Sequence, residues 1–120
     1  MNITFDFPSD DYTGGVQQEY TDSSLLGDFS VKRILLRIAG NAAVNFFGVY
    51  VAPSNLTLAA ADRARYEIYS NGAVAVAVDP APDLNVTGTA IPFRLYDGWS
   101  IYVYYVGDQN PTVAVADLFI

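Results

Sequence analysis

The chain is 120 residues long, carries a net charge of −7 and contains 52% apolar against 16% charged residues. This length fits one domain with a hydrophobic core of its own. The chain has no cysteine and no histidine. That composition excludes disulfides, thiolate metal sites, histidine ligands and every catalytic mechanism that pairs a nucleophile with a histidine.

The negative charge is concentrated near the N-terminus. Residues 1–30 contain no basic residue and six acidic residues: Asp6, Asp10, Asp11, Glu19, Asp22 and Asp28. The remaining seven of the 13 acids and all six bases lie in residues 31–120, which leaves that part of the chain nearly neutral. Nucleic acid is therefore not an expected partner, because phosphate binding requires a basic surface.

The N-terminal sequence MNITFDFPSDDY has neither a basic n-region nor an apolar h-region, so we expect no signal peptide. No run of about 18 apolar residues is present, so we expect neither a membrane-spanning helix nor a membrane partner. These features together predict synthesis in a cytoplasm.

The first 29 residues show little periodicity. A brief alternation ends at Phe7, and the Gly14-Gly15 pair interrupts the segment again. We therefore predict an acidic extended N-terminal arm over residues 1–29, held against a partner or against the body of the protein. The candidate partner-binding residues of this arm are Phe5, Phe7, Asp10, Asp11, Tyr12 and Tyr20.

Residues 30–120 have the pattern of a β-sandwich domain. Alternating or β-branched runs predict strands in 30–38, 43–52, 64–69, 73–78, 84–96, 99–106 and 112–120. The fold class that follows is all-β: an antiparallel, jelly-roll-like sandwich of about seven or eight strands.

Local signals add two hairpins and one helix to this prediction. The dipeptides Asn71-Gly72 and Asp97-Gly98 each separate two strand-like runs, as in two-residue hairpin turns that need positive φ. The alanine-rich segment 56–65 follows Ser54-Asn55, two residues that commonly cap helices, and we expect one short helix there.

Several predicted strands are apolar on both faces. In 73–78, for example, valines alternate with alanines rather than with the polar residues of a hydrated face. Such faces are covered either by neighbouring subunits or by the arm folding back over one sheet. The candidate partner-binding residues on these faces are Ala73, Ala75, Ala77, Tyr102, Tyr104, Leu118 and Ile120.

Carboxylates are the only candidate catalytic or metal-binding groups. They occur as Asp10-Asp11, as Asp79 with Asp83, and in Asp108-Gln-Asn110, none with the spacing of a calcium loop. Asp and Asn at such positions commonly form turns. We therefore expect no catalytic residue, no metal site and no cofactor.

Aromatic residues allow three interpretations. Trp99 and Tyr96 could stack on sugar rings, together with the tyrosines at positions 50, 66, 69, 102, 104 and 105. Tyrosines at alternating strand positions also form cross-strand packing pairs. They are equally suited to protein interfaces, because they add contact area at low entropic cost.

The chain as a whole resembles the small capsid-associated proteins of bacteriophages, which include decoration (cement) proteins and minor capsid proteins. The resemblance is carried by the arm 1–29, the hairpins at Asn71-Gly72 and Asp97-Gly98, and the closing strand 112–120. It is one of general character without a diagnostic motif, so no functional residue is transferred. It implies oligomers, often trimers, that sit on a protein shell.

The function that we expect is therefore a non-enzymatic virion structural protein on a capsid surface. Its expected partners are other copies of itself and a major capsid protein. The alternative is a glycan-binding β-sandwich module that uses Trp99 and the nearby tyrosines. A carboxylate-based hydrolase is a third hypothesis, and it requires two acids that face one cleft.

Overall fold

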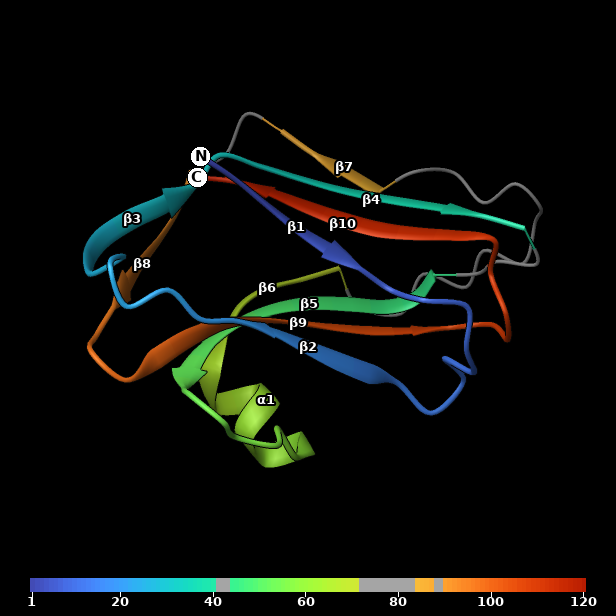
Figure 1. The fold of residues 1–120 in the computed structure, drawn as a ribbon, viewed down its shortest axis with the longest axis horizontal. Helices are drawn as coiled ribbons and strands as arrows, with labels where there is room; N and C mark the ends of the chain where they lie inside the picture. The colour runs from blue at the N-terminus through green and yellow to red at the C-terminus, as the bar shows by residue number, and fades with distance from the viewer. Residues whose placement is uncertain (41–43, 72–83, 88–89) are drawn as a thin grey trace.

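The computed structural model describes residues 1–40, 44–71, 84–87 and 90–120. Within these residues the protein has ten strands and one short helix. Two four-stranded antiparallel sheets pack face to face, and a two-stranded ribbon joins them at one end (Figure 1). The predicted all-β antiparallel sandwich is confirmed.

Each layer of the sandwich combines strands from distant parts of the sequence. Sheet I has the order β1 (Asn2–Asp6), β10 (Val113–Phe119), β4 (Arg33–Ala39) and β7 (Leu84–Val86). Sheet II has the order β2 (Val16–Tyr20), β9 (Trp99–Gly107), β5 (Val44–Pro53) and β6 (Glu67–Ser70). The ribbon consists of β3 (Gly27–Val31) and β8 (Ile91–Leu95).

The strand pairs are nested inside one another. The first strand pairs with the last, β2 with β9, β3 with β8, β4 with β7 and β5 with β6, all antiparallel. The two further pairs, β10 with β4 and β5 with β9, complete the two sheets. A long antiparallel ribbon folded over into two layers in this way is a jelly roll.

The core lies between the two sheets and is built by alternation along each strand. In β4, Ile34, Leu36 and Ile38 are buried while the residues between them face outward. In β9, Ile101, Val103 and Tyr105 point into the same core. The alternation read from the sequence is therefore confirmed in these strands.

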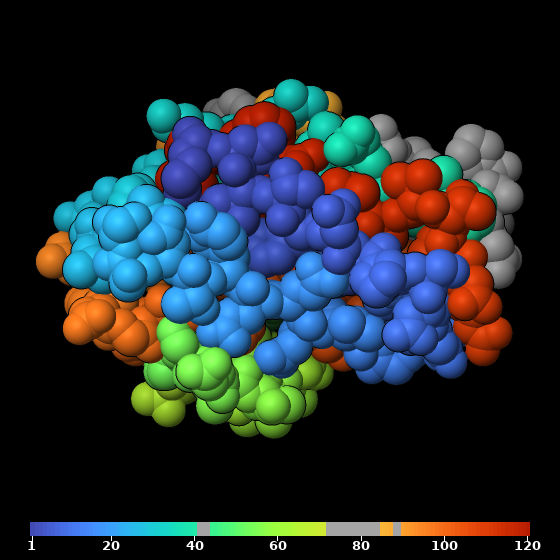
Figure 2. All heavy atoms as spheres, in the orientation of Figure 1, coloured from blue at the N-terminus to red at the C-terminus, as the bar shows by residue number. Residues whose placement is uncertain are grey.

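The prediction of a separate arm over residues 1–29 is wrong. These residues form β1, β2 and most of β3, and Figure 2 shows them (blue) lying across the body of the protein. Phe5 lies opposite Ala116 of β10 and is 4% exposed, while Phe7 and Tyr12 are buried in the same core. Short apolar stretches between polar residues are sufficient here, because each one pairs with a strand from the other end of the chain.

The Asp97-Gly98 dipeptide forms a turn but not a hairpin. Gly98 has a φ of +78°, and the N–H of Trp99 donates to the carbonyl oxygen of Tyr96 at 3.1 Å. The flanking strands do not pair with each other, since β8 pairs with β3, and β9 pairs with β2 and β5. The turn instead marks the corner where the chain passes from the ribbon into sheet II.

The expected helix is present as α1 (Ala60–Tyr66) and begins later than the alanine-rich segment 56–65 suggested. Asn55, one of the two expected caps, lies in a left-handed turn at φ 61° before the helix. The carboxylate of Asp62 instead accepts the N–H of Ala59 at 3.2 Å and satisfies one free donor at the helix start.

A substitution in β1 tests whether the N-terminal residues are part of the core. We expect Phe5→Ala to lower the free energy of unfolding by about 3–5 kcal/mol, because it leaves a cavity where a buried ring packs. The measurement is chemical denaturation followed by circular dichroism. Asn2→Ala, at an exposed position of the same strand, is the control and should change stability little. If both variants were equally stable, residues 1–29 would not contribute to the core and the prediction of a separate arm would stand.

Candidate interaction surfaces

The outer face of sheet II is covered by the chain itself. The segment before α1 and the helix pack on Tyr50 and Tyr102, both fully buried, and Leu58 completes this second small core. The hydroxyl of Tyr102 donates to the carbonyl oxygen of Pro53 at 2.6 Å and accepts the N–H of Leu56 at 3.1 Å. The prediction that Tyr102 binds a partner is therefore wrong, because this chain already occupies that face.

The covering segment is fastened to sheet II by side chains of β2 and β9. The amide of Gln17 donates to the carbonyl oxygen of Leu56 at 2.9 Å and accepts the N–H of Leu58 at 2.8 Å. The guanidinium of Arg63 lies 4.2 Å from the ring centroid of Tyr104. Tyr104, expected to bind a partner, is half-buried and is already covered in part by the helix.

Glu19 is the acidic side chain that helps to hold the covering segment on sheet II. Its Oε2 accepts the N–H of Asn55 at 3.0 Å and the hydroxyls of Ser100 at 2.7 Å and Thr21 at 3.2 Å. Partial burial acts to raise the pKa of Glu19, but these hydrogen bonds to the charged form outweigh it and lower the pKa below 4.5.

The lowered pKa makes a pH-dependent prediction for Glu19→Gln. A carboxyl group whose pKa falls on folding stabilises the protein above its unfolded pKa, and this stabilisation is lost as the pH falls through the folded pKa. We expect the variant to be less stable by about 1 kcal/mol at neutral pH, allowing for partial solvent exposure. The difference between the two proteins should shrink in acid. Denaturation curves at neutral and at acidic pH measure the difference in the free energy of unfolding between parent and variant. An equal difference at the two pH values would contradict the prediction.

The outer face of sheet I, which we call the open face, is covered by no other described part of the chain (Figure 1). Its residues alternate with the buried ones of β1, β4 and β10. Half-buried or exposed apolar side chains on this face are Leu35, Ala39, Val113, Val115 and Phe119. Polar positions between them are Asn2, Thr4, Asp6, Arg33, Arg37, Asn85 and Asp117.

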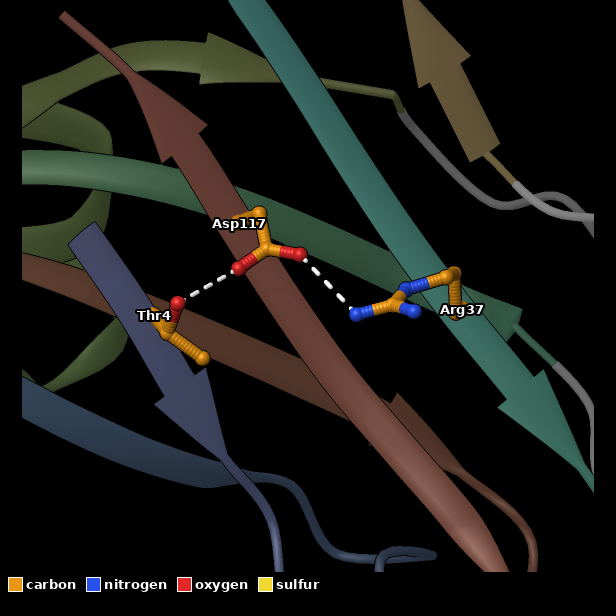
Figure 3. A network of polar contacts seen from close by, with 3 residues as sticks. All are labelled: Thr4, Arg37 and Asp117. Atoms are coloured by element: carbon orange, nitrogen blue, oxygen red, sulfur yellow. Dashed lines mark hydrogen bonds and ion pairs between the residues drawn. The ribbon is translucent and has the colours of Figure 1, made fainter. Parts of the chain in front are cut away.

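A polar network spans three strands in the middle of the open face (Figure 3). The Asp117 carboxylate accepts the hydroxyl of Thr4 at 2.6 Å on one side and the guanidinium of Arg37 at 3.1 Å on the other. Asp117 is only 6% exposed, whereas half of the Arg37 side chain is in solvent. At the end of the face, the guanidinium carbon of Arg33 lies 5.2 Å from the ring centroid of Phe119.

Leu118 was assigned to the wrong face of the last strand, whereas the assignment of Ile120 to a partner contact stays a prediction. Leu118 is fully buried in the core between the sheets, so it cannot contact a partner. Ile120 is half-buried and its N–H donates to the carbonyl oxygen of Met1 at 2.8 Å, beside the N-terminus. Alternation separated the two sides of β10 correctly, but the inward side carries the alanines.

Ile120 lines an open groove of about 700 Å³ at the end of the sandwich where both termini lie. Within the groove, the rings of Phe29 and Phe93 stack at 5.7 Å between centroids. The other lining residues are Met1, Leu25, Asp28, Ser30, Lys32 and Pro92. The groove lies between the ribbon of β3 and β8 and the two chain ends next to β1 and β10.

Three aromatic rings, which we call the aromatic row, meet where the β8–β9 turn approaches the end of α1. The ring centroid of Trp99 lies 5.7 Å from that of Tyr66 and 5.4 Å from that of Tyr96. Guanidinium groups flank the row, with Arg65 5.3 Å from the Tyr66 ring and Arg94 5.6 Å from the Tyr96 ring. Trp99 and Tyr96, the expected stacking pair, are therefore in contact with each other.

The remaining predicted residues lie on the surface. Asp10 and Asp11 are exposed, and hydrogen bonds from Thr13 lower the pKa of Asp11. Tyr20 is half-buried and donates to the carboxylate of Asp22 at 3.3 Å. These residues are turn formers and strand residues rather than the tip of an arm.

The described residues contain no cluster of three acidic side chains able to hold a metal ion, and no helix among them is long and apolar enough to cross a membrane. Ala73, Ala75, Ala77, Asp79, Asp83 and the Gly72 turn position lie outside the described residues.

The chain matches no protein family model and no curated protein. Among solved structures, it is similar to a chain of the T13 IBDV viral particle (17% identity, TM-score 0.28) and to one of the infectious bursal disease virus Gx strain (11%, 0.27). These matches cover 99% and 98% of this chain but only 31% of either neighbour. TM-scores this low do not define a shared fold, so the fold assignment rests on strand order alone.

Proposed function

We propose that this chain is a non-enzymatic structural protein of a virus particle, which contacts other protein copies through the open face of sheet I. The nested strand order supports the proposal, because jelly rolls are a common fold of viral capsid domains. Lectin domains use the same fold, so the fold alone does not define the function. The observation that carries the proposal is the open face.

The open face has the composition of an interface between proteins. Leu35, Val113, Val115 and Phe119 place apolar side chains on a sheet surface that no described segment covers. Soluble monomers rarely leave contiguous apolar surface exposed, and such surface commonly marks a protein contact. Interface centres are depleted in free charge, and the two charged groups in the middle of this face, Asp117 and Arg37, are paired with each other.

The carboxylate of Asp117 in the middle of this face already has hydrogen-bond partners within the chain, which favours the binding of a partner protein there. Thr4 and Arg37 both bond to the Asp117 carboxylate within the free chain. A partner that covers the face would therefore not leave a buried, unpaired carboxylate, which is the costly outcome for a charge at an interface. The Arg37 side chain is half exposed, so its guanidinium can also donate to acidic or carbonyl groups of a partner.

The specific role that we propose is that of a capsid decoration (cement) protein or a minor capsid protein on the particle surface. Its partners would be copies of itself, assembled as a trimer, and a major capsid protein. Neither a cofactor nor a catalytic step is required, because burial of the open face against a neighbour supplies the binding energy.

Paired charge substitutions test the open face. We expect the variant L35E/V113E to stay folded but to lose self-association, because two carboxylates would have to be buried in the interface. The control variant A60E/A64E adds the same charge at exposed positions of α1. Analytical ultracentrifugation over a range of concentrations should give oligomers for the parent and the control, and monomers for the open-face variant.

A second measurement addresses the particle itself. Mass spectrometry of purified virus particles from the source organism should detect the chain as a stoichiometric component. A parent protein that stays monomeric at high concentration and is missing from the particles would overturn the proposal.

A further inference from the structure

The aromatic row offers exposed ring surface at a fixed position of the fold. Trp99 is anchored because it is half-buried and packs against the main core, while Tyr96 beside it is 51% exposed. Tyr66 comes from the last residue of α1 and closes the other side of the row. Trp99 and Tyr66 therefore lie on a strand and a helix, and contact with Trp99 limits the freedom of the Tyr96 ring in the turn beside them.

Hydrogen-bonding groups border the same rings. Asp97 directly follows Tyr96 and is exposed, and Asn55 is exposed in the neighbouring turn. The two turns are tied together, since the N–H of Ser54 donates to the carbonyl oxygen of Gly98 at 2.8 Å. The space beside Gly98 is open, because no atom lies within 4 Å of where its side chain would begin.

We propose that the aromatic row binds a hexopyranose unit of a neutral glycan. One face of a pyranose ring presents C–H groups that are apolar and weakly positive, and it packs on the electron-rich face of an aromatic ring. The hydroxyls at the edge of the sugar need carboxylate or amide partners, which Asp97 and Asn55 can provide. A purely apolar ligand fits this site less well, because it would offer no hydrogen-bond partner to Asp97 and Asn55.

The net charge of the chain favours a neutral sugar over an acidic one, and the two guanidinium groups at the row are already in contact with other groups. Arg94 is already paired with the Asp28 carboxylate at 3.1 Å and stacks on Tyr96. Arg65 stacks on Tyr66 at the opposite end. The chain as a whole carries a charge of −7, which repels sialylated or sulfated glycans at long range.

The natural fluorescence of the protein reports on this site directly. Trp99 is the only tryptophan of the chain, so its emission follows events at the row without a label. The protein is screened on a glycan array, and the best neutral ligand is then titrated alongside the methyl glycosides of glucose, galactose, mannose and N-acetylglucosamine. We expect a saturable change in Trp99 emission with a neutral sugar.

Variants at Tyr96 separate stacking from a general loss of structure. Tyr96→Ala should weaken sugar binding about tenfold, whereas Tyr96→Phe should keep it, because the ring is retained. Leu26→Ala is the matched control, since Leu26 is equally exposed at 51% on another loop and should bind sugar like the parent. Thermal unfolding checks that each variant is folded. Trp99→Ala is not used, because Trp99 packs against the core and its removal could itself unfold the protein.

Three results would overturn this proposal. One is the absence of any array signal and of any saturable emission change with the parent protein. Another is sugar binding that survives Tyr96→Ala unchanged. The third is loss of self-association in Tyr96→Ala while the parent binds no sugar, which would assign the row to a protein interface. Self-association through the open face is measured independently, so the two proposals fail or stand separately.

Discussion

The nested pairing of strands from opposite ends of the chain is the constraint on which the whole structure depends. Neither sheet can be completed by one half of the sequence, because β1 pairs only with β10 and β2 only with β9. The ends meet as a result: the Met1 amino group donates to the Ile120 carbonyl oxygen at 2.7 Å. Such distant pairings carry a large loop-closure cost during folding and are typical of slowly folding β proteins. The acidic N-terminal segment is therefore structural throughout.

This constraint also explains where the sequence was informative. Local alternation identified β4, β9 and β10 closely, because burial of one face leaves a period of two in the residues themselves. Around β1 the alternation of Ile3, Phe5 and Phe7 was visible as one short strand at most, but the sequence could not show that this strand pairs with β10, more than a hundred positions away. The turn at Asp97-Gly98 was likewise visible, but the sequence could not show that the strands on either side of it pair with other strands, since pairing depends on the global strand order.

The candidate sites show the same limit. Both faces of β10 carry large apolar side chains, so the only residue in the sequence of this strand that indicates the outward side is Asp117, which alternation places with Val115. The inward side carries Ala114 and Ala116, whose small side chains pack fully buried between the sheets. The contact of Trp99 with Tyr96 follows from closeness in sequence and was predictable. The contact of Tyr66 with Trp99 could not be predicted from the sequence, because it depends on how α1 lies on sheet II. Tyr66 was only one of six tyrosines considered as neighbours of Trp99.

The two outer faces of the sandwich are treated differently by the same chain. Sheet II is closed by the segment before α1, which Gln17 and Glu19 hold, and by the helix itself, which contributes no buried residue and lies with Arg63 over the Tyr104 ring. Sheet I keeps its apolar side chains at the surface and neutralises its central charge internally. Among the described residues, one outer face is therefore closed by the chain itself and the other is not, and this difference is what the proposed contact through sheet I uses.

The aromatic row then lies at a different place from the open face. It belongs to the corner between β8 and β9 and to the end of α1, on the sheet II side of the molecule (Figure 1). A protein attached through sheet I would keep this corner turned away from its attachment surface. If the chain attaches through sheet I as proposed, the three aromatic rings and their polar border face the surrounding solution, where a glycan can reach them.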